Sequence, residues 1–356
     1  MSKVALMMAA GTGGHVFPAL AVAKQLVEEG YEVHWLGTPT GMENRLVPMN
    51  GFPLHAVNIK GLRGKGFAGI LAAPWLIAKA VWQSLKIIRQ IKTNVVIGFG
   101  GYIAGPGGVA ARLAGLPLII HEQNALSGLT NRMLNRISHT SLQAFPGTLP
   151  GAVTVGNPVR ADLVCSDFDL KVNPDRLRVL VIGGSLGAKA LNDAVLACWQ
   201  LLEEDKRPEL RHQVGQKDSE RMLAAYQNTD VKAEVTAFID DMAAAYQWAD
   251  LMICRAGAST VSEVAAAGKP AIFVPFPFAV DDHQTVNAGY LVGAGGALLK
   301  QQSELTPEWL AEQISNLDSD RGRLEQMARI NRNKALPDAT EHAVKEIERT
   351  IHDHQS

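Results

Sequence analysis

The chain of 356 residues has little cysteine, little net charge and no long apolar run. Its three cysteines, Cys165, Cys198 and Cys254, are too few and too scattered for a disulfide or zinc framework, which indicates a reducing compartment. A formal net charge of −1 argues against a nucleic-acid-binding protein that acts through a global positive field. No uninterrupted apolar run approaches the roughly 18–20 residues of a membrane-spanning helix, so no transmembrane segment is expected.

Short apolar segments alternate with helix-like segments along the whole chain. The first, VALMMAA (4–10), passes directly into a glycine loop, so it indicates a first strand rather than a cleaved signal segment. Residues 249–277 repeat the order found in 94–123: a strand, a glycine loop, an Ala-rich helix, and Gly-x-Pro before another strand. Strands that are apolar at every position and alternate with helices indicate a parallel sheet covered on both faces.

A seam with two Asn-Pro steps interrupts this alternation at residues 156–176. The pattern therefore predicts an α/β protein of two doubly wound, Rossmann-like domains. In such sheets ligands bind at the carboxyl ends of the strands, so the expected ligand site is a cleft across which the two domains face each other.

The first glycine loop, GTGGH (11–15), lies between the first expected strand and a helix expected over about residues 17–29. Glycines at this position let backbone N–H groups approach a phosphate. The spacing matches neither G-x-G-x-x-G nor G-x-x-x-x-G-K-[ST], and neither motif requires a histidine. We hypothesise that His15 is a general base or positions an acceptor, because the positive end of the helix dipole disfavours imidazolium.

A second loop, VIGGSLGAKALN (181–192), contains G-x-S-x-G between a strand and a helix, the pattern of a hydrolase nucleophile elbow centred on Ser185. Triad partners in the right chain order would be Asp240, Asp241 or Asp250, followed by His283. Alternatively, the glycines admit a phosphate to a helix N-terminus, and the Ser185 hydroxyl donates to it. We favour the phosphate, because a hydrolase would leave the first half of the chain and its own glycine loop without a role.

The stretch CRAGASTVSEVAAAG (254–268) places a loop of small residues before another helix, whose free N–H groups suit a diphosphate. Glu263 follows Thr260 by three residues, in what is expected to be the first turn. T-x-x-E is a capping box, so Glu263 either caps its own helix or accepts hydrogen bonds from two ribose hydroxyls. The residues alone leave both interpretations open.

Two further polar stretches follow expected strands. In PFPFAVDDHQTVNA (275–288), neighbouring acidic residues seldom chelate one ion together, so Gln284 and its loop indicate sugar contacts rather than a metal site. HEQN (121–124) follows a buried strand, which places Asn124 at the carboxyl edge of the sheet unless the segment is an ordinary polar turn.

Residues 60–92 contain seven Lys or Arg residues and no acidic residue. They include an uncharged run, FAGILAAPWLIA (67–78), which Trp82 follows. A core helix with a solvated basic face would account for this composition. We favour an interfacial patch, in which apolar and Trp side chains enter the headgroup region and cations meet anionic lipid.

Taken together, these motifs resemble the MurG family of bacterial glycosyltransferases, and the resemblance runs from about residue 3 to about 345. The matching segments are GTGGHVFPALAVA (11–23), GLRGKG (61–66), GFGGYIAGPGG (98–108), HEQNALSGLTNR (121–132), GNPVR (156–160), GGSLGA (183–188), FIDDMAAAY (238–246) and CRAGASTVSEVAAAG (254–268). The family adds N-acetylglucosamine to lipid I and so makes lipid II for peptidoglycan. The DDHQ loop and residues 161–176 are segments where its members vary.

The resemblance implies the GT-B fold, inversion at the anomeric carbon, no required metal and no cofactor. It also implies an acceptor domain of residues 1–160 with a returning helix at 338–356, and a UDP-sugar domain of residues 161–337. The implied partners are UDP-N-acetylglucosamine and lipid I; the basic patch at residues 60–92 adds an anionic membrane surface, and the near-neutral charge argues against nucleic acid. The implied location is peripheral, on the cytoplasmic face of the bacterial inner membrane.

The resemblance also implies a role for each candidate residue. Uracil would meet backbone groups of Ile239, and the ribose hydroxyls would meet Glu263. The diphosphate would be held by Ser185 and the loop of Ala258, Ser259, Thr260, Val261 and Ser262. Gln284 would contact the N-acetylglucosamine hydroxyls, and Arg160 and Asn124 would complete the cleft. Thr12, Gly13 and Gly14 would face the reaction centre and the acceptor's pyrophosphate. The competing functions are a UDP-sugar epimerase of the same shape and a serine hydrolase using Ser185.

Overall fold

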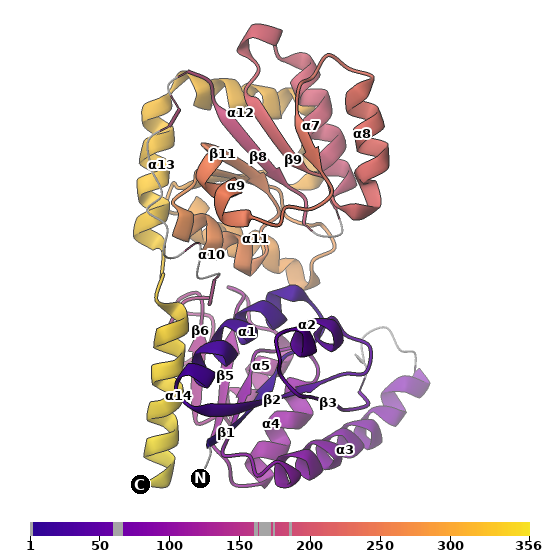
Figure 1. The fold of residues 1–356 in the computed structure, drawn as a ribbon, viewed down its shortest axis with the longest axis vertical. Helices are drawn as coiled ribbons and strands as arrows, with labels where there is room; N and C mark the ends of the chain where they lie inside the picture. Colours follow the sequence, from indigo (N-terminus) through magenta and orange to yellow (C-terminus); the bar gives the residue numbers. More distant parts are fainter. Residues whose placement is uncertain (1–2, 60–66, 160–162, 164–171, 174, 185–186) are drawn as a thin grey trace. The chain divides into compact units, whose positions relative to one another are not determined.

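The structure, a computed structural model, describes residues 3–59, 67–159, 163, 172–173, 175–184 and 187–356, with residues 67–72 described by their backbone only. The chain divides into two compact units (Figure 1). The first comprises Met1–Val159 and Leu336–Ser356, and the second comprises Arg160–Ala335.

The first unit is built on a seven-stranded, wholly parallel sheet with the strand order β3-β2-β1-β4-β5-β6-β7. Its strands are β1 (Lys3–Met8), β2 (Tyr31–Gly37), β3 (Leu54–Ala56), β4 (Val95–Gly98), β5 (Leu118–Glu122), β6 (Thr140–Gln143) and β7 (Val153–Thr154). Its helices are α1 (Gly13–Glu28), α2 (Glu43–Met49), α3 (Phe67–Gln90), α4 (Ala104–Leu113), α5 (Leu129–Leu134) and α14 (Ala339–Gln355).

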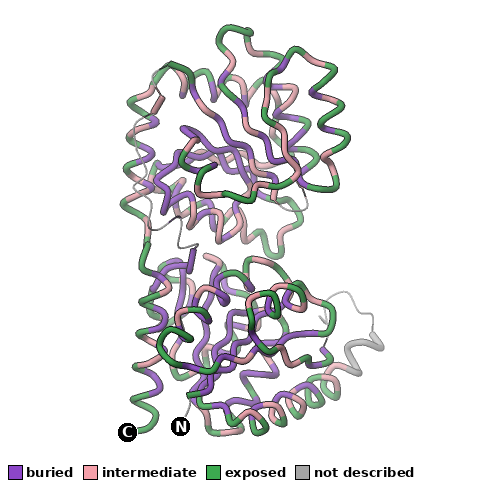
Figure 2. The backbone as a smooth tube through the Cα atoms, viewed as in Figure 1, coloured by how far each residue is buried: buried purple, intermediate pink, exposed green. Residues whose placement is uncertain are grey.

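Helices cover both faces of this sheet, because alternate side chains of each strand point to opposite faces. Ala5 and Met7 of β1 join a core with α1 and α14, whereas Leu6 and Met8 join a core with α3, α4 and α5. Figure 2 shows the strands as the buried part of the unit and the outer sides of the helices as exposed. The last helix, α14, contacts α1 and β6, so the end of the chain belongs to the first unit.

The second unit repeats the scheme with a six-stranded parallel sheet in the order β10-β9-β8-β11-β12-β13. Its strands are β8 (Arg178–Ile182), β9 (Glu209–Gln213), β10 (Glu234–Thr236), β11 (Leu251–Cys254), β12 (Ala271–Phe273) and β13 (Ala297–Leu299). Its α-helices are α7 (Lys189–Leu201), α8 (Ser219–Gln227), α9 (Met242–Trp248), α10 (Ala258–Ala267), α11 (His283–Val292), α12 (Pro307–Ser319) and α13 (Arg321–Lys334). The described part of the unit also has the short 3-10 helices η1 (Glu204–Lys206), η2 (Gln216–Asp218), η3 (Val280–Asp282) and η4 (Gln302–Glu304).

The predicted fold class, two doubly wound parallel-sheet domains, is confirmed. Helix α1 begins at Gly13 rather than near residue 17, so His15 lies inside the first turn. Cys198 and Cys254 are free and buried, and burial raises the pKa of both thiols. Within the described ranges, every helix is too short or too polar to cross a bilayer.

Candidate active site

Each sheet has one point where its strand order reverses, between β1 and β4 in the first unit and between β8 and β11 in the second. Ligands of doubly wound folds bind beside such switch points, at the carboxyl ends of the strands. In the first unit, the glycine loop at 11–14 follows β1, and Gly100 and Gly101 follow β4. Gly101 has a φ of +76°, and a Cβ there would lie 2.6 Å from the Ala10 carbonyl oxygen, so the two loops meet backbone to backbone.

His15 lies in the first turn of α1, where the backbone N–H groups of His15 and Val16 donate to the carbonyl of Thr12. Its Nδ1 is 3.0 Å from Oε1 of Gln123, which comes from the segment after β5. A Cβ on Gly100 would lie 3.1 Å from both Cε1 and Nδ1 of the imidazole. The glycine after β4 therefore leaves the space that the His15 ring needs at the switch point.

A buried carboxylate anchors the first glycine loop to the rest of the unit. Glu43, at the start of α2, is fully buried and accepts a hydrogen bond from the Gly11 N–H at 3.1 Å. Its other oxygen accepts from the backbone N–H of Thr38 at 3.0 Å and from the Thr38 hydroxyl at 2.7 Å. Glu43 was not expected as a site residue, and its only signal in the sequence is an acidic residue at the start of a helix.

The HEQN segment is held from within by its own glutamate. Glu122 is 2% exposed and accepts from the backbone and side-chain amide groups of Asn124, and also from Gly128 and Asn131. The segment is thus an ordered platform at the carboxyl end of β5, with Asn124 at its edge as predicted. Its histidine, His121, is fully buried, which lowers the pKa of this imidazole to about 4.

In the second unit the loop after β8 passes close to the backbone after β9. Gly187 has a φ of +80°, and a Cβ there would lie 2.5 Å from the Val214 carbonyl oxygen. Gln213, at the end of β9, exchanges two hydrogen bonds with Gly184 and donates a third to the Ala237 carbonyl. One buried side chain therefore ties the glycine loop to the segment that carries Ile239. Ser185 lies outside the described residues.

The position of Glu263 corrects one expectation. Helix α10 begins at Ala258 and its N-cap is Gly257, which has extended dihedrals (φ −62°, ψ 148°). Thr260 is therefore inside the first turn and Glu263 is in the second, too far along the helix for a capping box. The buried Tyr246 of α9 donates its hydroxyl hydrogen to Oε2 of Glu263 at 3.1 Å, which orients the carboxylate.

The first turn of α10 carries Ala258, Ser259 and Thr260, and Val261 and Ser262 follow in the same helix. The hydroxyl oxygen of Ser259 is buried and makes no hydrogen bond within the described part of the chain. Since a buried hydroxyl without a partner is costly, this group is suited to meet a ligand atom. The N-cap residue Gly257 has no side chain that could cap α10.

Gln284 lies in the first turn of α11 and Ile239 lies in the loop before α9. Oε1 of Gln284 accepts from the backbone N–H groups of Ala256 and Phe276, which leaves its amide nitrogen as the group that could reach a sugar. Ile239 is half-buried and precedes Asp241, whose side chain caps α9 by accepting from the Ala244 N–H.

Two aspartates that would serve a serine hydrolase have structural roles instead. Asp241 is the N-cap of α9, and the carboxylate of Asp250 accepts from the backbone N–H groups of Asn173 and Arg178. Asp250 immediately precedes β11, at the amino end of the strands, whereas the glycine loop of Ser185 follows the carboxyl end of β8. These placements disfavour a triad built on either aspartate.

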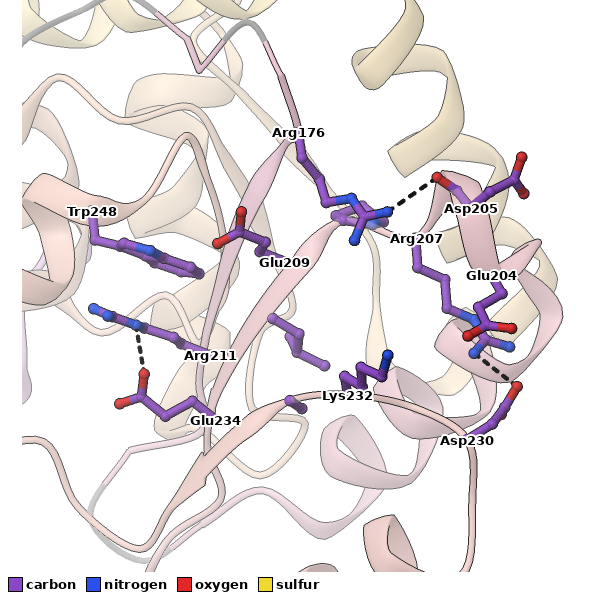
Figure 3. Close-up of a pocket in the computed structure, with 13 residues that line it drawn as sticks. Arg176, Glu204, Asp205, Arg207, Glu209, Arg211, Asp230, Lys232, Glu234 and Trp248 are labelled. Atoms are coloured by element: carbon purple, nitrogen blue, oxygen red, sulfur yellow. Dashed lines mark hydrogen bonds and ion pairs between the residues drawn. The ribbon is translucent and has the colours of Figure 1, made fainter.

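A groove of about 920 Å³ lies elsewhere in the second unit, at the amino ends of β9 and β10 (Figure 3). Two ion pairs line it: Arg207 bonds to Asp230 at 2.9 Å, and Arg211 bonds to Glu234 at 2.8 Å and stacks on Trp248. It contains none of the predicted site residues.

The candidate residues separate by unit. Thr12, Gly13, Gly14, His15 and Asn124 gather at the carboxyl edge of the first sheet. Ile239, the 258–262 segment, Glu263 and Gln284 gather at the corresponding edge of the second. Arg160 lies outside the described residues. Across the described ranges, no three His, Cys, Asp or Glu side chains come together as a metal site would require.

Comparison with known proteins gives consistent matches over nearly the whole chain. The model of the glycosyltransferase family 28 N-terminal domain matches residues 5–142, and that of its C-terminal domain matches residues 178–343. A Marinobacter nauticus protein named UDP-N-acetylglucosamine--N-acetylmuramyl-(pentapeptide) pyrophosphoryl-undecaprenol N-acetylglucosamine transferase is 52% identical over 346 residues, 95% of each chain. The crystal structure of Acinetobacter baumannii MurG has a TM-score of 0.85 at 46% identity, covering 98% of this chain and 99% of that one.

A more distant likeness concerns the competing epimerase function. A putative UDP-N-acetylglucosamine 2-epimerase from Listeria monocytogenes has a TM-score of 0.67, covering 96% of this chain and 95% of that one. The two sequences are only 14% identical, so this likeness shows the fold alone.

Proposed function

Because the chain belongs to glycosyltransferase family 28, we propose that it transfers N-acetylglucosamine from UDP-N-acetylglucosamine to the muramoyl hydroxyl of lipid I. The product would be lipid II for peptidoglycan synthesis, which serves cell-wall growth, cell shape and division. The observation that carries this proposal is the near-full-length similarity to the Marinobacter transferase, whose name states that reaction. This similarity favours a transferase over the epimerase and the serine hydrolase.

The second unit supplies the groups suited to the sugar nucleotide. We assign the ribose hydroxyls to Glu263, because Tyr246 orients its carboxylate in the second turn of α10. We assign the diphosphate to the first turn of α10, including Ser259, because free N–H groups and a buried hydroxyl there favour negative charge. Ser185, Ile239 and Gln284 keep the roles that the resemblance implies.

The chemistry needs two events on opposite sides of the anomeric carbon. The acceptor O–H bond breaks as the new O–C1 bond forms, and the bond from C1 to the diphosphate oxygen breaks with its electron pair leaving on UDP. Backbone N–H groups of α10 stabilise the charge that grows on UDP, since they are already oriented when the reaction begins. We assign the proton to His15, and the acceptor's pyrophosphate to Thr12, Gly13 and Gly14, with Arg160 and Asn124 completing the site.

One assay separates this function from its competitors. UDP release is followed with UDP-N-acetylglucosamine alone and then with lipid I added. A transferase releases UDP in quantity only with lipid I, whereas an epimerase converts the sugar nucleotide without any acceptor. Labelling of Ser185 by a serine-directed phosphonate would instead indicate the hydrolase.

We further propose that α3 binds this enzyme to the cytoplasmic face of the bacterial inner membrane. Trp75, Lys79, Trp82 and Lys86 follow one another at spacings of four, three and four, so they form a single stripe. The two tryptophans are 66% and 63% exposed, and each lysine ammonium lies 5–6 Å from the ring before it. Exposed tryptophans alternating with cations suit the boundary between headgroups and acyl chains.

The helices next to α3 carry further exposed apolar side chains. Helix α3 contacts α4, and α4 contacts α5. Leu113 on α4 and Leu129 and Met133 on α5 are all more than 60% exposed. The basic segment 60–66 lies outside the described residues.

Vesicle binding tests this surface. Lys79→Glu with Lys86→Glu should weaken binding to vesicles containing phosphatidylglycerol about tenfold or more, since each cation contributes about 1 kcal/mol near an anionic surface. The matched control is Lys24→Glu with Lys345→Glu, which makes the same charge change on α1 and α14, the helices of the opposite face. Equal binding by the two double variants would refute the assignment.

A further inference from the structure

The hydrogen bonds behind His15 determine which of its two ring nitrogens carries the proton. They begin at His121, which is fully buried and whose Nε2 is 2.9 Å from the carbonyl oxygen of Gly156. A carbonyl only accepts, so Nε2 of His121 is protonated. Burial lowers the pKa of His121 to about 4, so near neutrality this is its single ring proton and Nδ1 is an acceptor.

The protonation of His121 determines how the side-chain amide of Gln123 is oriented. Its amide nitrogen lies 3.3 Å from Nδ1 of His121 and 3.3 Å from the His121 carbonyl oxygen, and both of these atoms are acceptors. The NH₂ group must therefore point toward His121, because the reversed amide would place its oxygen against two acceptors. Gln123 is 1% exposed, so water does not compete for these positions.

The amide oxygen of Gln123 consequently faces His15. It lies 3.0 Å from Nδ1 of that ring and can only accept, so Nδ1 of His15 carries a proton. A neutral imidazole has one ring proton, which leaves the lone pair on Nε2. Gly100 lies against the Nδ1–Cε1 edge of the ring, so a side chain there would push the imidazole out of this position.

We propose that Gln123 and His121 are positioning residues that hold His15 in the Nδ1–H form, with Nε2 as the atom that removes the acceptor's proton. This inference rests on the proposed transferase function. When Nε2 takes the proton, the resulting imidazolium keeps its Nδ1–H bond to Gln123, so the ring does not reorient during the reaction. The partner is a neutral amide rather than a carboxylate, so it selects the tautomer and supplies no counter-charge.

Nitrogen NMR of protein labelled with ¹⁵N-histidine tests the tautomer without measuring activity. The His15 signals are assigned by their loss in His15→Asn. Neutral His15 should show the Nδ1–H pattern in the wild type, and an Nε2–H pattern there would overturn the inference. In Gln123→Leu the proton is no longer tied to Nδ1, so the Nε2–H form should appear.

Two further variants separate a relay from general damage. His121→Phe keeps a ring to stack on Phe99 but frees the Gln123 amide to turn, so it should change the tautomer of His15 without touching it. Gln143→Leu is the matched control, because Gln143 is a buried glutamine at the end of the neighbouring strand β6 whose side chain bonds to Leu149, Ala152 and Thr154. It should lose comparable thermal stability and leave the His15 tautomer unchanged.

Kinetics complete the test. Gln123→Leu should lower kcat at least about tenfold, with little change in the KM for UDP-N-acetylglucosamine, because general-base catalysis is typically worth about 10²–10⁴. The transferase function stands if the wild type transfers sugar and His15→Ala does not. The positioning role of Gln123 and His121 is refuted if, in addition, Gln123→Leu keeps both the Nδ1–H form of His15 and full kcat. Absence of transfer by wild type would instead refute the proposed function.

Discussion

Replacing Glu263 by glutamine tests the assignment of the ribose site. The structure places this carboxylate in the second turn of α10 with one oxygen bonded to the Tyr246 hydroxyl at 3.1 Å. Each hydrogen bond to a charged group contributes about 1.5–3 kcal/mol, and glutamine retains one acceptor oxygen without the charge. We therefore expect kcat/KM for UDP-N-acetylglucosamine to fall by about 10- to 150-fold, mainly through KM. Because no helix cap is lost, the melting temperature should change by less than about 2 °C.

The decisive measurement pairs this variant with a sugar nucleotide that lacks the ribose 2′-hydroxyl. The wild type should discriminate strongly against the deoxy compound, and Glu263→Gln should discriminate weakly, because the partner of that hydroxyl has been altered. Glu312→Gln, an exposed carboxylate on α12, is the control for removing one negative charge from the same unit. Equal discrimination by the wild type and Glu263→Gln would refute the ribose assignment. An unchanged KM for UDP-N-acetylglucosamine together with a melting temperature lower by several degrees would indicate that Glu263 has a purely structural role.

Three other predictions concern the first unit and the buried histidines. His15→Ala should lower kcat by about 10²–10⁴ at saturating substrates, and a loss below about tenfold in steady-state assays would exclude the base role. Glu43→Ala leaves three donors without their acceptor, namely the N–H groups of Gly11 and Thr38 and the Thr38 hydroxyl. Urea unfolding should therefore give a free energy of unfolding lower by about 3–5 kcal/mol, and a loss under about 0.5 kcal/mol would contradict the anchoring role. Burial lowers the pKa of His121 to about 4 and of His212 to about 3 from 6.5, so below pH 6.5 the unfolded chain binds protons that the native state does not. The two buried histidines therefore contribute their full stabilisation above pH 6.5, and the free energy of unfolding should fall toward pH 4 with a slope approaching about 2.7 kcal/mol per pH unit. Unfolding curves taken across that range should show roughly half this slope for His212→Phe.

The architecture could be predicted from the sequence because its signals are local. Strands buried on both faces are apolar at nearly every position, as in VALMMAA, and the glycine loops directly follow them in the chain. The carboxyl ends of parallel strands share one edge of a sheet, so the candidate residues could be placed there without coordinates. The repeated order of 94–123 and 249–277 likewise corresponds to β4–α4–β5 and β11–α10–β12.

Glu263 illustrates where a local pattern misleads. T-x-x-E is compatible with a cap at Thr260, but the same letters occur within a helix that has already begun. The chain leaves β11 and turns at Gly257, whose extended dihedrals end the loop three residues earlier than the capping box requires. The start of α10 is thus determined by how the chain leaves the sheet rather than by the side chains of its first turn.

Hydrogen bonds between residues far apart in the chain could not be predicted from local sequence patterns. The sequence by itself determined the two parallel-sheet domains, their glycine loops and the residues at the sheet edges, because hydrophobic pattern and glycine placement act over a few neighbouring residues. The tertiary structure alone decided that Glu43 anchors Gly11, that Tyr246 orients Glu263, and that Gln123, 108 residues away, contacts His15. In the last case the strand order sets β1 beside β4 and β4 beside β5, and this lateral order lets the side chains of His15 and Gln123, which follow β1 and β5, meet at hydrogen-bonding distance.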